Sequence, residues 1–119
     1  GESYFARSEL YDRDRHHFKR YIPVIRALAE AGWSPIPGAS SGQVAIERYG
    51  ADPGTIYLSV RNLGDTSEAA AINVDLAMLR PSAATLVVTE LFDGTTVTVN
   101  GLSANITLAA GDTQILQVH

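Results

Sequence analysis

Apolar residues recur at helical spacing in the N-terminal part of the chain. Between Asp12 and Ala31 they stand three and four positions apart, which places them on one face of an amphipathic helix. The members of this stripe are Phe18, Tyr21, Ile22, Ile25, Leu28 and Ala29. Gly32 suits the left-handed conformation that ends a helix, whereas Pro23 inside the pattern predicts a kink. We therefore expect one long, kinked helix, followed by a connector.

After Gln43 the apolar residues alternate with polar ones, so the period changes from 3.6 to 2. Strands with this pattern are half-buried and are typical of antiparallel sheets. The alternating positions are Val44 and Ile46 in one segment, Ile56, Leu58 and Val60 in a second, and Ile72, Val74, Leu76 and Met78 in a third.

Turn residues separate the strands in the C-terminal third. Asp93-Gly94 and Asn100-Gly101 suit tight hairpins in which both central residues have positive φ, and a third turn is expected at 110–112. We therefore predict a mainly β fold, an antiparallel β-sandwich of about six to eight strands preceded by one long N-terminal α-helix. The expected division is a helix and connector at 1–42 and a β-sandwich domain at 43–119.

The apolar stripe of the helix needs a partner surface. Burying each large apolar side chain contributes roughly 1.5–3 kcal/mol, and the sandwich is the only candidate surface in this chain. We expect the helix to pack on one face of a sheet, with Trp33 at the hinge. Val87 and Leu91 are the positions expected to form the second apolar face beneath it.

Composition narrows the class of protein. The chain has 119 residues, 45% of them hydrophobic and 18% charged, which suits one globular domain. It has no cysteine, and therefore no disulfide or zinc-thiolate site. No apolar run approaches the roughly 20 residues that span a membrane. The net charge of −4 argues against nucleic acid as a partner. Six of the nine Lys and Arg residues nevertheless lie in residues 1–30.

We find no catalytic centre in the sequence. His16 and His17 lie beside Asp12 and Asp14, and Asp12 and His16 share a helix face; a metal site there is conceivable, but a solvated helix surface explains the pattern better. The strand carboxylates, Glu47, Asp75 and Glu90, have no spacing that implies a common cleft. Glu90 is unusual because it alternates with apolar residues, which a sheet edge or an arginine partner would explain. We expect no metal and no cofactor.

Aromatic residues are the remaining candidates for binding. Trp33 stands between helix and connector, Tyr49 falls on the face of Ala45 and Glu47, and Tyr57 points away from the face of Ile56 and Leu58. One interpretation is that Trp33 packs the helix against the sandwich while the tyrosines cover a sheet. The other is that Trp33, Tyr49 and Tyr57 form a platform on which sugar rings stack.

Several segments together resemble the end of a (β/α)8 glycoside hydrolase that runs into its C-terminal β-sandwich. The helical segment is YDRDRHHFKRYIPVIRALAEAGWSPI. It is followed by Glu47-Arg48-Tyr49, by an apolar strand ending in Asn62, and by Gly111-Asp112-Thr113 before the last apolar strand at 115–118. Catalytic acids of such barrels lie at the ends of barrel strands, which this chain does not contain. The resemblance therefore implies no catalytic residue here.

What the resemblance implies is a non-catalytic C-terminal accessory domain that packs on the catalytic (β/α)8 domain of a glycoside hydrolase. It also implies an extracellular or periplasmic bacterial protein, whose secretion signal was removed or lay upstream. Two alternatives stay open. One is a carbohydrate-binding module whose partner is a polysaccharide. The other is a protein–protein interaction domain that docks through its amphipathic helix.

Overall fold

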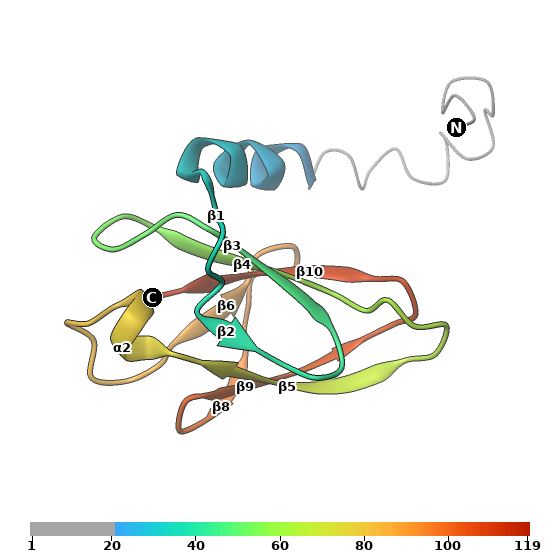
Figure 1. Ribbon diagram of the computed structural model, residues 1–119. Helices are drawn as coiled ribbons and strands as arrows, with labels where there is room; N and C mark the ends of the chain where they lie inside the picture. Colours follow the sequence, from blue (N-terminus) through green and yellow to red (C-terminus); the bar gives the residue numbers. More distant parts are fainter. Residues whose placement is uncertain (1–20) are drawn as a thin grey trace.

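The computed structural model describes residues 21–119 as two antiparallel sheets packed face to face, with a helix above them (Figure 1). The larger sheet has six strands, in the order β1 (Trp33–Ser34), β3 (Ala45–Tyr49), β4 (Ile56–Arg61), β10 (Thr113–Val118), β6 (Val88–Glu90) and β7 (Thr95–Thr96). The smaller has four, in the order β2 (Ala39–Ser40), β5 (Glu68–Val74), β9 (Ser103–Leu108) and β8 (Thr98–Asn100).

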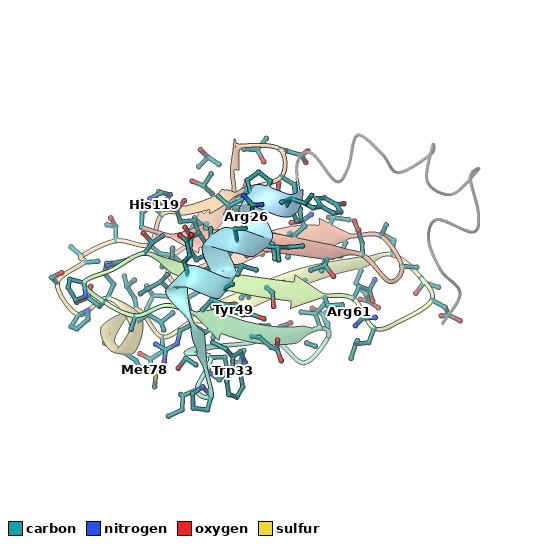
Figure 2. The ribbon with its side chains drawn as sticks, turned by 90° about the horizontal axis from the view of Figure 1, so that it is seen from above. Arg26, Trp33, Tyr49, Arg61, Met78 and His119 are labelled. Carbon is teal, nitrogen blue, oxygen red and sulfur yellow. The ribbon has the colours of Figure 1, made fainter. Side chains whose placement is uncertain are left out.

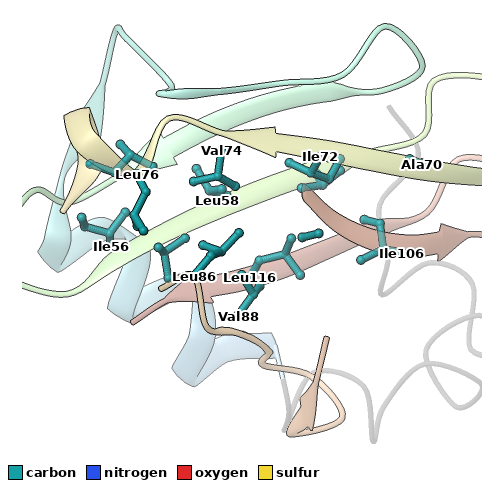
Figure 3. Close-up of a cluster of buried hydrophobic side chains, with 14 of the residues drawn as sticks. Ile56, Leu58, Ala70, Ile72, Val74, Leu76, Leu86, Val88, Ile106 and Leu116 are labelled. Atoms are coloured by element: carbon teal, nitrogen blue, oxygen red, sulfur yellow. The ribbon is translucent and has the colours of Figure 1, made fainter. Parts of the chain in front are cut away.

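The core lies between the inner faces of the two sheets. Every second residue of β4 is buried, and the same alternation recurs in β5 and β9. Figure 3 shows the two sets of side chains meeting in one layer. The largest fully buried side chains of this layer are Ile56, Leu58, Ile72, Leu79, Leu108 and Leu116. The predicted sandwich is confirmed, because the period-2 pattern after Gln43 supplies one apolar face to each sheet. The described residues form ten strands rather than about six to eight, since the two-residue strands β1 and β2 were not predicted and residues 95–100 hold two strands, β7 and β8.

Two predicted elements are shorter than the sequence pattern suggested. The third alternating segment ends as a strand at Val74, and Leu76–Leu79 forms the one-turn helix α2 instead. Asp75 explains the change, because its carboxylate accepts a hydrogen bond from the Met78 backbone N–H at 3.1 Å and so begins a helix. Met78 consequently lies at the surface rather than on a strand.

The expected length of the helix is also corrected. The helix that the structure describes covers residues 21–31 and ends at Gly32, whose φ of 87° only glycine adopts readily. Pro23 is the third residue of this stretch, and the Lys19 carbonyl that its ring would crowd lies outside the described residues, so the kink stays a prediction. Phe18 and the rest of the pattern before Tyr21 lie outside the described residues.

The Asn100-Gly101 turn is displaced by one residue. Asn100 pairs with Ser103, so the two central residues are Gly101 and Leu102, and only Gly101, with a φ of 60°, is left-handed. A glycine at the first central position is typical of a type II′ turn. Asp93-Gly94 likewise closes a longer loop, because Glu90 pairs with Thr95 and leaves 91–94 between the strands.

The helix does rest on a sheet face, as predicted, although on different partners. It lies over the outer face of the six-stranded sheet (Figures 1 and 2), with Leu28 buried and the Tyr21 ring against Phe92. The expected apolar partner Val87 is exposed. Instead, Ile115 of β10 is buried near the first half of the described helix. Ile22 and Ile25, which were expected to be covered, remain about half exposed, and Ile25 lines a groove with Tyr21, Phe92 and Ile115.

Candidate functional site

The three aromatic residues chosen as a sugar platform lie in one row across the six-stranded sheet. Trp33 of β1 pairs with Tyr49 of β3, and Tyr49 pairs with Tyr57 of β4. Residues directly opposite one another in antiparallel strands point to the same face, with their Cβ atoms about 4.5–5.5 Å apart. We call Trp33, Tyr49 and Tyr57 the aromatic row. It occupies the outer face, because Ile56 and Leu58 of β4 turn to the core.

The aromatic row runs from the free edge of the sheet to the helix. Trp33 lies on the edge strand and is 60% exposed, whereas Tyr49 and Tyr57 are half-buried. Figure 2 shows Trp33 beyond the end of the helix and Tyr49 beside it. The Gly50 N–H donates to the Gly32 carbonyl at 2.8 Å and fixes this edge next to the helix end.

A groove of about 280 Å³ continues from Tyr57 between the helix end and the loop after β3. Its lining residues are Ala27, Glu30, Ala31, Gly50, Ala51, Gly54, Thr55 and Tyr57. This volume is near the lower end of ligand-binding clefts, roughly 300–1,000 Å³. The groove is therefore of a size for one small ring rather than for an extended cofactor.

Polar groups flank the aromatic row on the sheet. The Tyr49 hydroxyl donates to Glu47 Oε2 at 3.2 Å, and Glu47 lies opposite Ser59 in the register. Burial raises the pKa of the Tyr49 phenol, and the neighbouring Glu47 carboxylate raises this pKa further because a second negative charge beside it is unfavourable. The phenol therefore stays protonated at neutral pH and can donate a hydrogen bond.

The residues that carry the family resemblance have structural roles. Arg48 turns to the other face of β3 and donates to the Ser34 hydroxyl. Asn62 is 1% exposed; its Nδ2 donates to the carbonyls of Thr66, Leu108 and Ala109, and its Oδ1 accepts from the Gly64 N–H. A buried amide with both ends satisfied holds loops together and has little capacity left for a ligand.

Glu90 is buried on the inner face, and its partners differ from those expected. One oxygen accepts from the Phe92 N–H at 3.0 Å and the other from the Asp93 N–H at 2.8 Å. Backbone amides of the following loop thus hold the carboxylate, where an arginine or an edge position was predicted. Both oxygens of the buried side chain therefore have a hydrogen-bond partner.

The strand carboxylates do not converge. Glu47 lies beside Tyr49, Asp75 caps α2, and Glu90 holds its own loop. Within residues 21–119 no group of three His, Asp or Glu side chains is placed to hold a metal ion. The metal interpretation of His16 and His17 with Asp12 and Asp14 falls outside the described residues.

Sequence reasoning missed Arg80, and it placed Glu47 and Tyr49 on one strand face without predicting the hydrogen bond between them. Arg80 forms an ion pair with Asp52 at 2.9 Å and donates to the carbonyls of Gly54 and Val118. Nothing in the local sequence signals this long-range contact. The hydrogen bond could have been predicted, because Glu47 stands two residues before Tyr49 on the same strand face.

The fold defines a class, namely an antiparallel β-sandwich of six and four strands with a helix over the larger sheet. α-Galactosidase I from Mortierella vinacea contains a similar fold, with a TM-score of 0.50 and 12% identity over 67% of this chain and 22% of that chain. A GH27 β-L-arabinopyranosidase from Geobacillus stearothermophilus matches with a TM-score of 0.50 and 9% identity, over 68% of this chain and 19% of that chain.

The predicted resemblance to a β domain of glycoside hydrolases is thus confirmed at the level of fold. The chain spans only about a fifth of the length of these enzymes. No family model and no curated protein sequence matches it. Among residues 21–119 there is no helix long and apolar enough to cross a membrane.

Proposed function

We propose that this chain is a non-catalytic accessory domain of a glycoside hydrolase and that it packs on the catalytic domain of the same protein. The observation that carries the proposal is an uncovered apolar strip along the helix. Ile22 and Ile25 stay 46% and 58% exposed on it, although Ile25 is on the same side of the helix as Tyr21 and lines a groove with Phe92 and Ile115. Large apolar side chains left open to solvent beside a packed helix face are typical of a surface that meets another body.

The likeness in fold favours a catalytic domain as the second body. In the two similar enzymes this fold accounts for 22% and 19% of the chain, so most of each protein lies outside it. A catalytic (β/α)8 domain against the exposed strip of the helix would cover Ile22 and Ile25. Such an interface would resemble those between domains of one chain, which bury about 600–1,500 Å².

Docking is tested by titrating the isolated catalytic portion of the full-length protein with this chain. We expect saturable binding that Ile22→Asp and Ile25→Asp each weaken at least about tenfold, because a charge would be buried in the contact. Leu63→Asp is the control, since Leu63 is also an exposed aliphatic residue, at 69%, but lies in the loop after β4. Equal binding by all three variants would contradict the proposal. Capture of an unrelated protein by the same face would instead favour an interaction domain.

The non-catalytic part of the proposal has its own test. The isolated chain should release no reducing sugar from a panel of glycans, because Glu47, Asp75 and Glu90 are held apart in separate contacts. Release of sugar that is lost on Glu47→Gln would show that this domain has a catalytic centre after all.

A further inference from the structure

We propose that the edge of the six-stranded sheet binds a hexopyranose unit of a polysaccharide, which stacks on Trp33 and Tyr49 and hydrogen-bonds to Glu47. This site is separate from the docking face, because Ile22 and Ile25 lie in the first half of the helix and Trp33 follows its last residue. A domain could therefore contact its enzyme and a sugar chain at the same time.

The pairing of the strands carries the argument. Trp33, Tyr49 and Tyr57 are neighbours only because β1 pairs with β3 and β3 with β4 in this register. A shift of one residue in either pair would send a ring to the opposite face. β1 is the edge strand of the sheet, and more than half of the Trp33 side chain is exposed to solvent.

The chemistry of the row suits a sugar. The two faces of a pyranose ring differ from its rim, since C–H groups cover a face and hydroxyl groups surround it. Aromatic side chains that present an apolar body and a polar end match such a ligand. Here Trp33 and Tyr49 supply the apolar bodies, and the Glu47 carboxylate and Tyr49 hydroxyl supply an acceptor and a donor beside them.

The charge at the row selects against other ligands. Glu47 lies beside Tyr49, and Glu30 lines the groove that begins at Tyr57. These carboxylates repel phosphate groups, which disfavours a nucleotide or nucleic acid. The same carboxylates can accept hydrogen bonds from sugar hydroxyls. The groove at Tyr57 gives room for the next unit of a chain whose first unit lies on Trp33 and Tyr49.

The single tryptophan provides a direct measurement. Because Trp33 is the only Trp in the chain, its fluorescence reports on this edge alone. We expect a saturable change in its intensity or emission maximum when the full chain is titrated with galactomannan, galactan, starch or a soluble β-glucan, all of which contain hexopyranose units. The same polysaccharides cast into a native gel should retard the chain.

Variants separate stacking from a structural role. Trp33→Ala and Tyr49→Ala should each weaken retardation by the bound polysaccharide about tenfold or more. Tyr49→Phe keeps the ring and should retain most of it, and Leu63→Ala is a control for an exposed apolar residue elsewhere. Thermal unfolding of each variant checks that the fold is intact.

Two results would overturn the proposal. One is that none of the four polysaccharides changes the fluorescence or the migration of the chain. The other is that retardation occurs but survives Trp33→Ala in a folded protein. Neither result bears on Ile22 and Ile25, so failure of this site and failure of docking to the catalytic domain are distinguishable.

Discussion

The ring of Tyr21 packs against the ring of Phe92, with centroids 4.3 Å apart and planes inclined by 41°. This contact joins the helix to the loop between β6 and β7. The loop is itself held by Glu90, whose two oxygens accept the backbone N–H groups of Phe92 and Asp93. The buried acid therefore positions the ring on which the start of the described helix rests.

Phe92→Ala should loosen the helix without unfolding the sandwich. It removes an aromatic pair worth about 0.5–1.5 kcal/mol beyond the area it buries, so we expect about 1–3 kcal/mol less stability. Hydrogen exchange should show faster exchange of amides in the helix than in β4. Tyr21→Phe keeps both rings and serves as the control. Unchanged helix exchange in Phe92→Ala would mean that Leu28 alone anchors the helix.

Asn62→Ala should be among the most destabilising polar substitutions in the chain. It leaves the carbonyls of Leu108 and Ala109 and the N–H of Gly64 without the partner they have now. Leaving a buried polar group unpaired costs about 1–3 kcal/mol, so we expect a loss of about 2 kcal/mol or more in urea unfolding. Leu63→Ala next to it should change stability by less than about 0.5 kcal/mol. If Asn62→Ala also lost less than about 0.5 kcal/mol, water would be replacing the amide.

The displaced hairpin turn gives a paired prediction. Gly101 has a φ of 60°, so Gly101→Val should cost about 1 kcal/mol or more through backbone strain. No atom approaches within 4 Å of the position of an added Cβ there, so the strain does not arise from crowding. Asn100 has a negative φ, and Asn100→Val should therefore be tolerated in β8. Thermal unfolding of both variants tests this prediction. A larger loss of stability in Asn100→Val than in Gly101→Val would instead support a turn centred on Asn100-Gly101.

These cases show how far the sequence predicts the structure. Period-2 alternation predicted β4 and β5, because each strand turns one apolar face to the core. The same alternation failed at Leu76, where a single hydrogen bond to Asp75 outweighs the strand pattern. Glu90 could not be explained from sequence, because its partners are backbone N–H groups that every residue possesses.

The candidate site could likewise be predicted only in part. The sequence identified Tyr49 and Tyr57 by residue type and strand face and Trp33 by its place between helix and connector, but it did not predict which strands pair. Their adjacency depends on the register of β1, β3 and β4, which the loops between these strands set over long sequence distances. The predicted buried face of the helix was also too broad, because periodicity alone does not tell which part of an apolar face meets the sheet.

Stability should fall at alkaline pH because of Tyr49. Burial and the nearby Glu47 raise the pKa of this phenol in the folded state, so the folded chain holds the proton more tightly than the unfolded chain. The resulting stabilisation is present in full below the ordinary tyrosine pKa of about 10 and is lost as pH rises through the higher folded value. Tyr49→Phe should flatten the decline above about pH 10. Unfolding free energies measured from pH 8 to 11 test this, and parallel curves for the two proteins would contradict it.

The final prediction compares two aliphatic residues of one helix. Leu28 is 8% exposed and Ile25 is 58% exposed, so the isolated chain should depend on the first and not the second. Leu28→Ala opens a cavity between helix and sheet and should cost about 2–4 kcal/mol, whereas Ile25→Ala should cost less than about 0.5 kcal/mol. Urea unfolding of the two variants gives the comparison directly. In the docking titration the order should reverse, because Ile25 lies on the face proposed to meet the catalytic domain. If Ile25→Ala proved as costly as Leu28→Ala in the isolated chain, Ile25 would be packed within this domain, and the face would not be free to dock.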